Sequence, residues 1–433
     1  MSVNMRNILL FAGIAALILA EGFTASWNTA LGIFNMGLIS AILALGVNMQ
    51  WGYAGLFNVG IMGFVALGGL APVLVSTAPV TEVWTLNGAF RLIFALIVGA
   101  GVIALAMLFN RRLSGRTRVG AMLLTLIGGF FLYRALFDPA VDVVEAFKPA
   151  THSNIGGLGL PVLLAWPVGG LFAAGAAWLI GKTALGLRSD YLAIATLGIA
   201  EIIIAVMKNE DWLARGVKNV ISIPRPVPYE VDLQHSPGFA QWAAGLGADP
   251  VTASTIVVKL LYAGLFTVIL LALLWATQKA LNSPWGRMMR AIRDNETAAE
   301  AMGKNVTRRH LQVFVLGSAI CGLAGAMIVT LDSQLTPGTY NPLRFTFLIW
   351  VMVIVGGSGN NWGAVLGGFL IWFLWIKVEP WGNALMDLVT SGMSDGSLKT
   401  HLRDSSAHMR LLTMGVVLLV VLRFSPRGLI PER

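Results

Sequence analysis

The chain has 433 residues, of which 56% are hydrophobic and only 12% charged, and its formal net charge is +9. A soluble globular domain carries roughly 25% charged residues, so this composition predicts a protein embedded in a lipid bilayer. The positive charge does not indicate nucleic-acid binding, because much of it lies in short loops between apolar stretches. The one cysteine, Cys321, cannot form an internal disulfide.

Twelve apolar stretches approach the length of about 20 residues that a membrane-spanning helix needs. They predict an all-α polytopic fold with about 10–12 transmembrane helices. The first stretch could pass for a signal peptide, but it is followed by further spans and has no convincing cleavage site, so we interpret it as a retained helix. The third, tenth and eleventh are short or glycine-rich, as re-entrant or broken helices are. The predicted spans are 8–26, 31–49, 56–76, 90–109, 119–137, 162–181, 191–207, 256–277, 311–331, 343–358, 362–378 and 409–423.

The strongly basic short loops all fall on one side of this arrangement. Loop 110–118 has four arginines, and loops 182–190 and 278–310 are also basic. Because basic loops remain in the cytoplasm, both termini and these loops are predicted to be cytoplasmic. The two long loops on the other side, 208–255 and 379–408, are predicted to be periplasmic. Each would suit a partner-facing surface or a simple connector. The whole chain, 1–433, is treated as one transmembrane domain.

Loop 278–310 contains a short helix signal. The spacing of Thr297 and Glu300 fits a capping box, and Gly303 can end the helix. One face of this helix would consist of Ala298, Ala301 and Met302. A short helix with small side chains on a cytoplasmic loop suits docking to another protein, although a solvated linker could carry the same charges.

No motif for catalysis or for a bound cofactor is visible. Gly181-Lys182-Thr183 resembles the end of a phosphate-binding loop, but Ala176 stands where that motif needs glycine. The five histidines and one cysteine show no metal-ligand spacing, so no metal site is predicted. If transport uses ATP, a partner must hydrolyse it.

Polar residues at membrane depth are the candidates for a translocation path. Glu201 is predicted near the middle of its span, where a carboxylate is costly and is functional by default, with a structural hydrogen bond as the alternative. The stretch 48–60 combines amides and glycines, which favours a broken helix or a tight turn over a uniform helix. The candidate path residues are Asn48, Gln50, Tyr53, Asn58 and Glu201. Separately, Gly363 and Gly367 form a GxxxG face that predicts close helix packing.

Four ordered blocks carry a family resemblance. WGYAGLFNVGIMGFVALGG (51–69), SDYLAIATLGIAEIIIAVMKNEDWLARG (189–216), SPWGRMMRAIRDNETAAEAMGKNV (283–306) and VIVGGSGNNWGAVLGG (353–368) resemble the LivM-type permease of branched-chain amino acid ABC importers. The resemblance implies a multi-pass protein of the bacterial inner (plasma) membrane. It also implies partners: a LivH-type permease subunit, two cytoplasmic ATPase subunits and a periplasmic substrate-binding protein.

The resemblance assigns a role to loop 278–310, since such permeases seat a cytoplasmic coupling helix in a cleft of the ATPase. The residues implied are Arg293, Asp294, Glu296, Ala298, Ala299, Glu300, Ala301 and Gly303. Segments 78–160 and 379–408 are additions relative to many members. Two alternatives remain open: an ABC permease for urea or another small polar solute, and a stand-alone secondary transporter that uses Glu201 for ion coupling.

Overall fold

The computed structural model describes residues 3–148, 154–393 and 396–432. It is almost wholly helical, and the strands β1 (Val220–Ile221) and β2 (Gln334–Leu335) form one small antiparallel sheet. Within the described ranges, ten helices are long and apolar enough to cross a membrane, and two shorter apolar helices accompany them. Each of the twelve predicted spans corresponds to one of these twelve helices, which confirms an all-α polytopic membrane protein.

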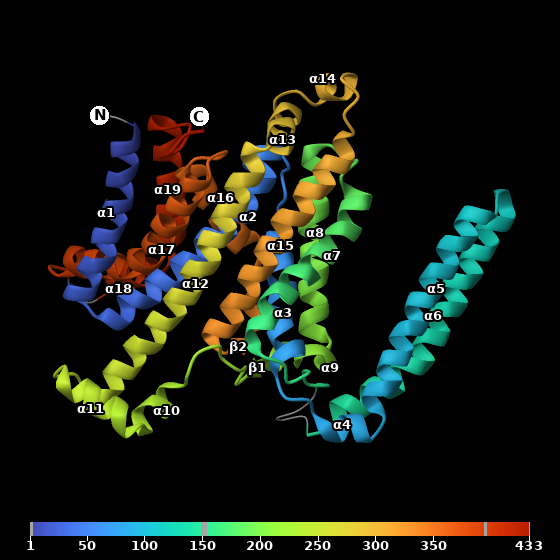
Figure 1. Ribbon diagram of the computed structural model, residues 1–433, viewed down its shortest axis with the longest axis horizontal. Helices are drawn as coiled ribbons and strands as arrows, with labels where there is room; N and C mark the ends of the chain where they lie inside the picture. The colour runs from blue at the N-terminus through green and yellow to red at the C-terminus, as the bar shows by residue number, and fades with distance from the viewer. Residues whose placement is uncertain (1–2, 149–153, 394–395, 433) are drawn as a thin grey trace.

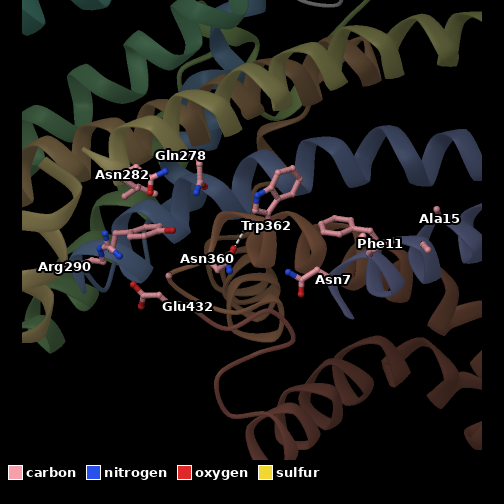
Figure 2. Close-up of a pocket in the computed structure, with 14 residues that line it drawn as sticks. Asn7, Phe11, Ala15, Gln278, Asn282, Arg290, Asn360, Trp362 and Glu432 are labelled. Atoms are coloured by element: carbon pink, nitrogen blue, oxygen red, sulfur yellow. Dashed lines mark hydrogen bonds between the residues drawn. The ribbon is translucent and has the colours of Figure 1, made fainter. Parts of the chain in front are cut away.

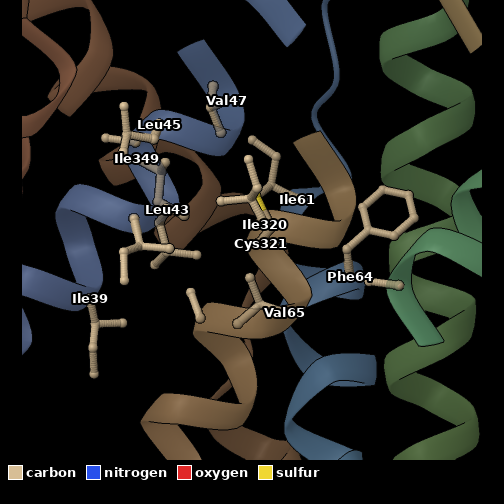
Figure 3. Close-up of a cluster of buried hydrophobic side chains, with 14 of the residues drawn as sticks. Ile39, Leu43, Leu45, Val47, Ile61, Phe64, Val65, Ile320, Cys321 and Ile349 are labelled. Carbon is tan, nitrogen blue, oxygen red and sulfur yellow. The ribbon is translucent and has the colours of Figure 1, made fainter. Parts of the chain in front are cut away.

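A central bundle is built around α2, which is buried along most of its length because it is apolar on all sides. Figure 3 shows side chains from α2, α3, α15 and α16 meeting in its core, among them Leu43, Phe64 and Cys321. The bundle consists of α2 (Trp27–Ala54), α3 (Ile61–Ser76), α7 (Ala165–Ala184), α8 (Ser189–Asn209), α12 (Pro250–Asn282), α15 (Val306–Asp332), α16 (Pro342–Gly356) and α17 (Asn361–Thr390). Helices α1 (Val3–Thr24) and α19 (Met409–Phe424) pack on its side near α17.

Glycines let these helices approach closely. A Cβ atom built on Gly68 of α3 would lie 1.8 Å from the carbonyl oxygen of Gly322 on α15. Between α16 and α17, Cβ atoms on Gly363 and Gly367 would overlap the carbonyl oxygens of Gly356 and Met352. The predicted close packing through the GxxxG face is therefore confirmed.

The two ends of the bundle carry different elements (Figure 1). The start of α1, the C-terminal end of the chain, α13 (Pro284–Asp294) and α14 (Glu296–Ala301) lie at one end, called here the α14 end. The small sheet lies at the opposite end, called the sheet end. The remaining short elements are α4 (Thr81–Thr85), η1 (Val162–Leu164), α9 (Asp211–Ala214), η2 (Gly216–Lys218), α10 (Glu230–His235), α11 (Pro237–Gly245), η3 (Pro337–Thr339), α18 (Ser397–Asp404) and η4 (Ser405–His408).

Helices α5 (Gly88–Arg112) and α6 (Gly115–Ala146) form a hairpin that stands beside the bundle in Figure 1. The two helices pack on each other and meet the rest of the chain mainly through α4 and α9. Trp212 of α9 packs on Phe137 of α6, and both belong to a small separate core. This hairpin makes up most of segment 78–160, which the sequence marked as an addition.

The two long loops contain more helix than the sequence suggested. Segment 208–255 includes α9, α10 and α11, and α12 already starts at Pro250, capped by Asp249. Segment 379–408 is largely helical too, because α17 continues to Thr390 and α18 follows. The polar residues of that extension are paired: Asp387 lies 2.8 Å from Arg403. Polar composition indicated a loop there, but these side chains are paired on helices instead.

Candidate functional site

The chain between α2 and α3 is a break in an otherwise continuous apolar stretch. Gly55 adopts a left-handed conformation (φ 69°) that ends α2, and α3 resumes only at Ile61. Non-helical backbone at membrane depth is tolerated only inside protein or beside water, so its polar groups need partners. Asn58 supplies one, because its Oδ1 accepts a hydrogen bond from the Gly60 amide at 2.9 Å.

Buried amides connect this break to α15. The Nδ2 of Asn58 donates to the Oε1 of Gln50 at 2.9 Å. The Nε2 of Gln50 donates in turn to the Phe314 carbonyl and the Ser318 hydroxyl, each at 3.0 Å. Both amide side chains are about 1% exposed, so the network is closed to solvent.

A second amide pair connects α2 to α17. The Nδ2 of Asn48 donates to the Oδ1 of Asn361 at 3.1 Å, and its Oδ1 accepts from the Gly359 amide at 2.8 Å. Asn361 also donates to Thr277 on α12 at 3.1 Å. The Asn48–Asn361 pair therefore connects α2, α17 and α12 at one buried point.

Replacing Asn48 with alanine is expected to lower the thermal unfolding midpoint of the detergent-solubilised chain by several degrees. The change leaves the Gly359 amide and one Asn361 bond unsatisfied, at a cost of about 1–3 kcal/mol for each group. Asn28→Ala is the control, because Asn28 is an exposed residue of the same helix. Equal midpoints for the two variants would contradict this structural role.

Arg293, at the end of α13, connects the α13–α14 segment to the end of α2. Its Nη1 donates to the Gly52 carbonyl and to Glu432, the latter at 2.8 Å, and its Nε donates to Asp294 at 3.1 Å. Partial burial lowers the pKa of Arg293, but the hydrogen bonds and charges of Glu432 and Asp294 outweigh that effect and raise it overall. The guanidinium is therefore a permanent cation at this junction.

The C-terminal tail, 425–432, joins the same junction. The amides of Leu429 and Ile430 donate to the carbonyls of Val355 and Gly356 at 2.9 and 2.8 Å. The Asn360 side chain then donates to the Pro431 carbonyl at 3.1 Å. The tail thus holds the turn between α16 and α17 against Arg293.

Helix α14 follows at the tip of the segment, and its cap differs from the prediction. Asn295 is the N-cap, and its Oδ1 accepts from the Ala298 amide at 3.0 Å, so the predicted capping box starting at Thr297 is wrong. The helix starts earlier because Asn295 takes the extended conformation that a cap requires. Gly303 ends the turn in a left-handed conformation (φ 74°), as predicted.

The two faces of α14 differ in exposure. Ala299 is 8% exposed and packs against the bundle. Ala298 and Ala301 are exposed, and Met302 is 78% exposed. Met302 and the two alanines thus give the tip of this polar segment a small exposed apolar face.

A large cavity lies beside this junction, at the α14 end (Figure 2). Its volume is about 980 Å³, and we call it the Arg290 cavity. Figure 2 shows Arg290 and Glu432 on one side of it and Phe11 of α1 on the other. Tyr53, a predicted path residue, also lines this cavity.

A smaller cavity of about 210 Å³ extends into the bundle from the sheet end. We call it the Asp332 cavity, and the short helices α3 and α16 both contribute to its wall. Along α2, Leu43 lines the Asp332 cavity and Tyr53 lines the Arg290 cavity, with the buried amides of Asn48 and Gln50 between them. Along α2 the amide network therefore lies between a cavity near the α14 end and a cavity near the sheet end.

The structure brings four of the five predicted path residues together. Asn48, Gln50, Tyr53 and Asn58 lie around the α2–α3 break. Glu201 does not join them: it is exposed on α8, whose buried face packs on α3.

The Asp332 cavity was missed from sequence. Asp332 ends a predicted span as an isolated carboxylate, which was an available signal, whereas Trp372 resembles many other tryptophans. No group of three or more potential metal ligands occurs among the residues that the structure describes.

Comparison with known proteins identifies this architecture. Residues 135–422 match the family model described as the permease component of the branched-chain amino acid transport system, which is more than half of the chain. The chain belongs to this family. The membership confirms the predicted permease and shows a transport component rather than an enzyme.

The permease resembles several curated proteins. It is 27% identical over 293 residues to the high-affinity branched-chain amino acid transport system permease protein LivM of Escherichia coli, covering 66% of this chain and 61% of that protein. The match thus spans less than two thirds of that relative. This chain is 25% identical over 393 residues to the probable LivM permease of Methanocaldococcus jannaschii, and the match covers 90% of each protein. A probable LivH permease of the same archaeon is 31% identical over 118 residues, 27% of this chain and 33% of that protein. No solved structure gives a significant match.

Proposed function

We propose that this permease is a subunit of an ATP-driven importer for branched-chain (hydrophobic) amino acids in the bacterial inner membrane. A periplasmic protein delivers the amino acid, and this chain and a LivH-type subunit form the path. Two cytoplasmic ATPase subunits supply the energy, which fits the absence of a nucleotide motif in the sequence. The α14 end faces the cytoplasm, because the basic loops 110–118 and 278–310 lie there.

The observation that carries the proposal is the connection through Arg293. The exposed face of α14 suits an ATPase cleft, and one residue of the adjoining α13 bonds to the end of α2 where the helix breaks. Movement of α14 would therefore reach the amide network between the two cavities. In this proposal Asn48, Gln50 and Asn58 position the break, and Tyr53 lines the inner part of the path.

Glu201 lies apart from the other candidate path residues, and a separate role is proposed for it. A carboxylate exposed on an apolar helix is unfavourable against lipid, so its face requires protein or water. It is proposed to face the path shared with the second permease subunit. Segments 208–255 and 379–408 are proposed to lie in or toward the periplasm.

Changing the exposed face of α14 is expected to prevent ATPase binding. Glu300→Lys and Ala301→Trp place a reversed charge and a bulky ring at the proposed contact, and should weaken co-purification of the ATPase subunits at least about tenfold, a loss of roughly 1.4 kcal/mol. Membrane insertion should not change, because both side chains are exposed.

Ala244→Trp on α11 is the matched control, because Ala244 is also exposed but lies toward the sheet end. The assay co-expresses this chain with candidate ATPase subunits. Unchanged co-purification and import in both α14 variants would remove α14 from the ATPase contact. Gradient-driven uptake by the purified chain without any ATPase would favour a secondary transporter.

A further inference from the structure

The Asp332 cavity contains a buried polar group that has no hydrogen-bond partner among the described residues. The indole Nε1 of Trp372, on α17, is buried without a hydrogen-bond partner. The Asp332 carboxylate forms no ion pair within the described ranges. Both side chains line the same cavity. Because buried polar groups nearly always have partners, the unpaired indole donor points to a bound molecule. The Asp332 side chain is exposed and is therefore open to a cationic group of that molecule.

The rest of the wall indicates the chemistry of that molecule. Apart from Asp332, Gln334 and several hydroxyl-bearing side chains, such as Thr336, the cavity is lined by aliphatic, thioether and aromatic side chains. The aliphatic ones matter most for an apolar ligand. Leu43, Val65 and Ile349, labelled in Figure 3, are three of them and come from three helices. Three methionines add flexible thioethers that adapt to ligands of different shape: Met36, Met62 and Met352.

The size of the cavity restricts the ligand further. At about 210 Å³ it is smaller than the roughly 300–1,000 Å³ pockets that hold drug-sized molecules. A small molecule with an apolar body, one cationic group and one anionic group fits the volume and the wall together. Free aliphatic amino acids have this composition.

We propose that the Asp332 cavity is a transient binding site for a free aliphatic amino acid, with Asp332 facing its ammonium group and the Trp372 N–H donating to its carboxylate. This inference rests on the import function proposed above and adds a substrate site inside this chain. The amides around the α2–α3 break do not form that site, because their hydrogen bonds are already made within the protein. One ion pair and one hydrogen bond from a neutral indole are few enough contacts for the ligand to leave again, which a site along a path requires.

Direct binding tests the site on the purified full-length chain in lipid nanodiscs. Saturation-transfer NMR with millimolar L-leucine is expected to give a signal that falls at least tenfold in Asp332→Asn and Trp372→Phe. The matched controls are Asp232→Asn, an exposed carboxylate on α10, and Trp381→Phe, an exposed indole on α17 itself. Absence of a leucine signal in the folded wild-type chain, or equal signals in all variants, would overturn the proposal.

A substitution that fills the cavity distinguishes a specific loss of ligand binding from a general loss of folding. Ile349→Trp is expected to reduce leucine binding much more than alanine binding. The contacts from Asp332 and Trp372 stay, and only the apolar space of the cavity shrinks. Equal losses for the two ligands would count against a size-matched site.

Import assays with the complete reconstituted system test this inference independently of the proposed function. Asp332→Asn and Trp372→Phe should import leucine at least tenfold more slowly while ATP hydrolysis stimulated by the loaded binding protein persists. Normal import by both variants would overturn the site and leave the function standing. Failure of the wild-type system to import leucine would instead refute the proposed function.

Discussion

Replacing Arg293 with alanine is expected to reduce leucine import at least tenfold while the ATPase subunits stay bound. The guanidinium bonds at once to the Gly52 carbonyl, to Glu432 and to its neighbour Asp294. Its side chain is 25% exposed, so water replaces these bonds only in part. Alanine therefore separates the α13–α14 segment from the end of α2 but leaves the exposed face of α14 intact.

The measurement is the number of leucine molecules imported per ATP hydrolysed by the reconstituted importer. Arg287→Ala is the matched control, because Arg287 is exposed on the same helix and its guanidinium donates to the Asn282 carbonyl at the adjoining end of α12, not to α2. Arg293→Lys should fall between the two, since lysine keeps the charge but lacks the fork that reaches two acceptors in fixed geometry. A wild-type import ratio for Arg293→Ala would show that coupling follows another route.

The tail offers a check on the same junction. If Arg293 and Glu432 act together, adding Glu432→Gln to Arg293→Ala should cause little further loss of import. Residues that share one network give such non-additive effects, whereas independent residues give additive ones. If the losses of import caused by the two substitutions multiply in the double variant, Glu432 lies outside the coupling route.

The helices were predictable because membrane burial imposes a simple length and composition rule. Within the described ranges, ten of the twelve stretches became helices that satisfy it, and the short third and tenth stretches became α3 and α16, the two helices too short to count as full spans. What failed was the interpretation of polar segments. The polar end of α17 carries Asp387, whose partner Arg403 sits on a later helix, and composition alone does not show such a pairing.

The residue types of the candidate site were predictable from sequence. The hydrogen-bond partners of those residues were less predictable. Amides among glycines indicated a break at 48–60, and the non-helical segment is found at 55–60, whereas 48–54 remain helical in α2. Asn48, however, bonds to Asn361, a residue 313 positions away, and no local pattern contains that information. The Asp332 cavity was harder to predict from sequence. It is recognised from a buried polar side chain that has no hydrogen-bond partner in the folded structure. Exposure likewise separates Ala299 from Ala298 on α14, although their residue type is the same.

Replacing Gly325 with valine is expected to lower the stability of the chain strongly. A Cβ atom at Gly325 would lie 2.0 Å from the Val65 carbonyl oxygen, so α15 and α3 would have to separate. Overpacking typically costs about 1–3 kcal/mol, and a backbone contact leaves no flexible side chain to move aside. The variant should unfold at a clearly lower temperature in detergent and lose its single peak in size-exclusion chromatography.

Gly264→Val is the matched control, because a Cβ atom there meets nothing within 4 Å and α12 is also a membrane helix. A stable, monodisperse Gly325→Val protein would show that the two helices are not in contact as described. The same contact also shapes the Asp332 cavity, because Val65 of α3 and Ile328 of α15 both line it. A milder substitution, Gly325→Ala, should therefore weaken leucine binding in whatever fraction remains folded, since it moves one wall of the cavity away from the other.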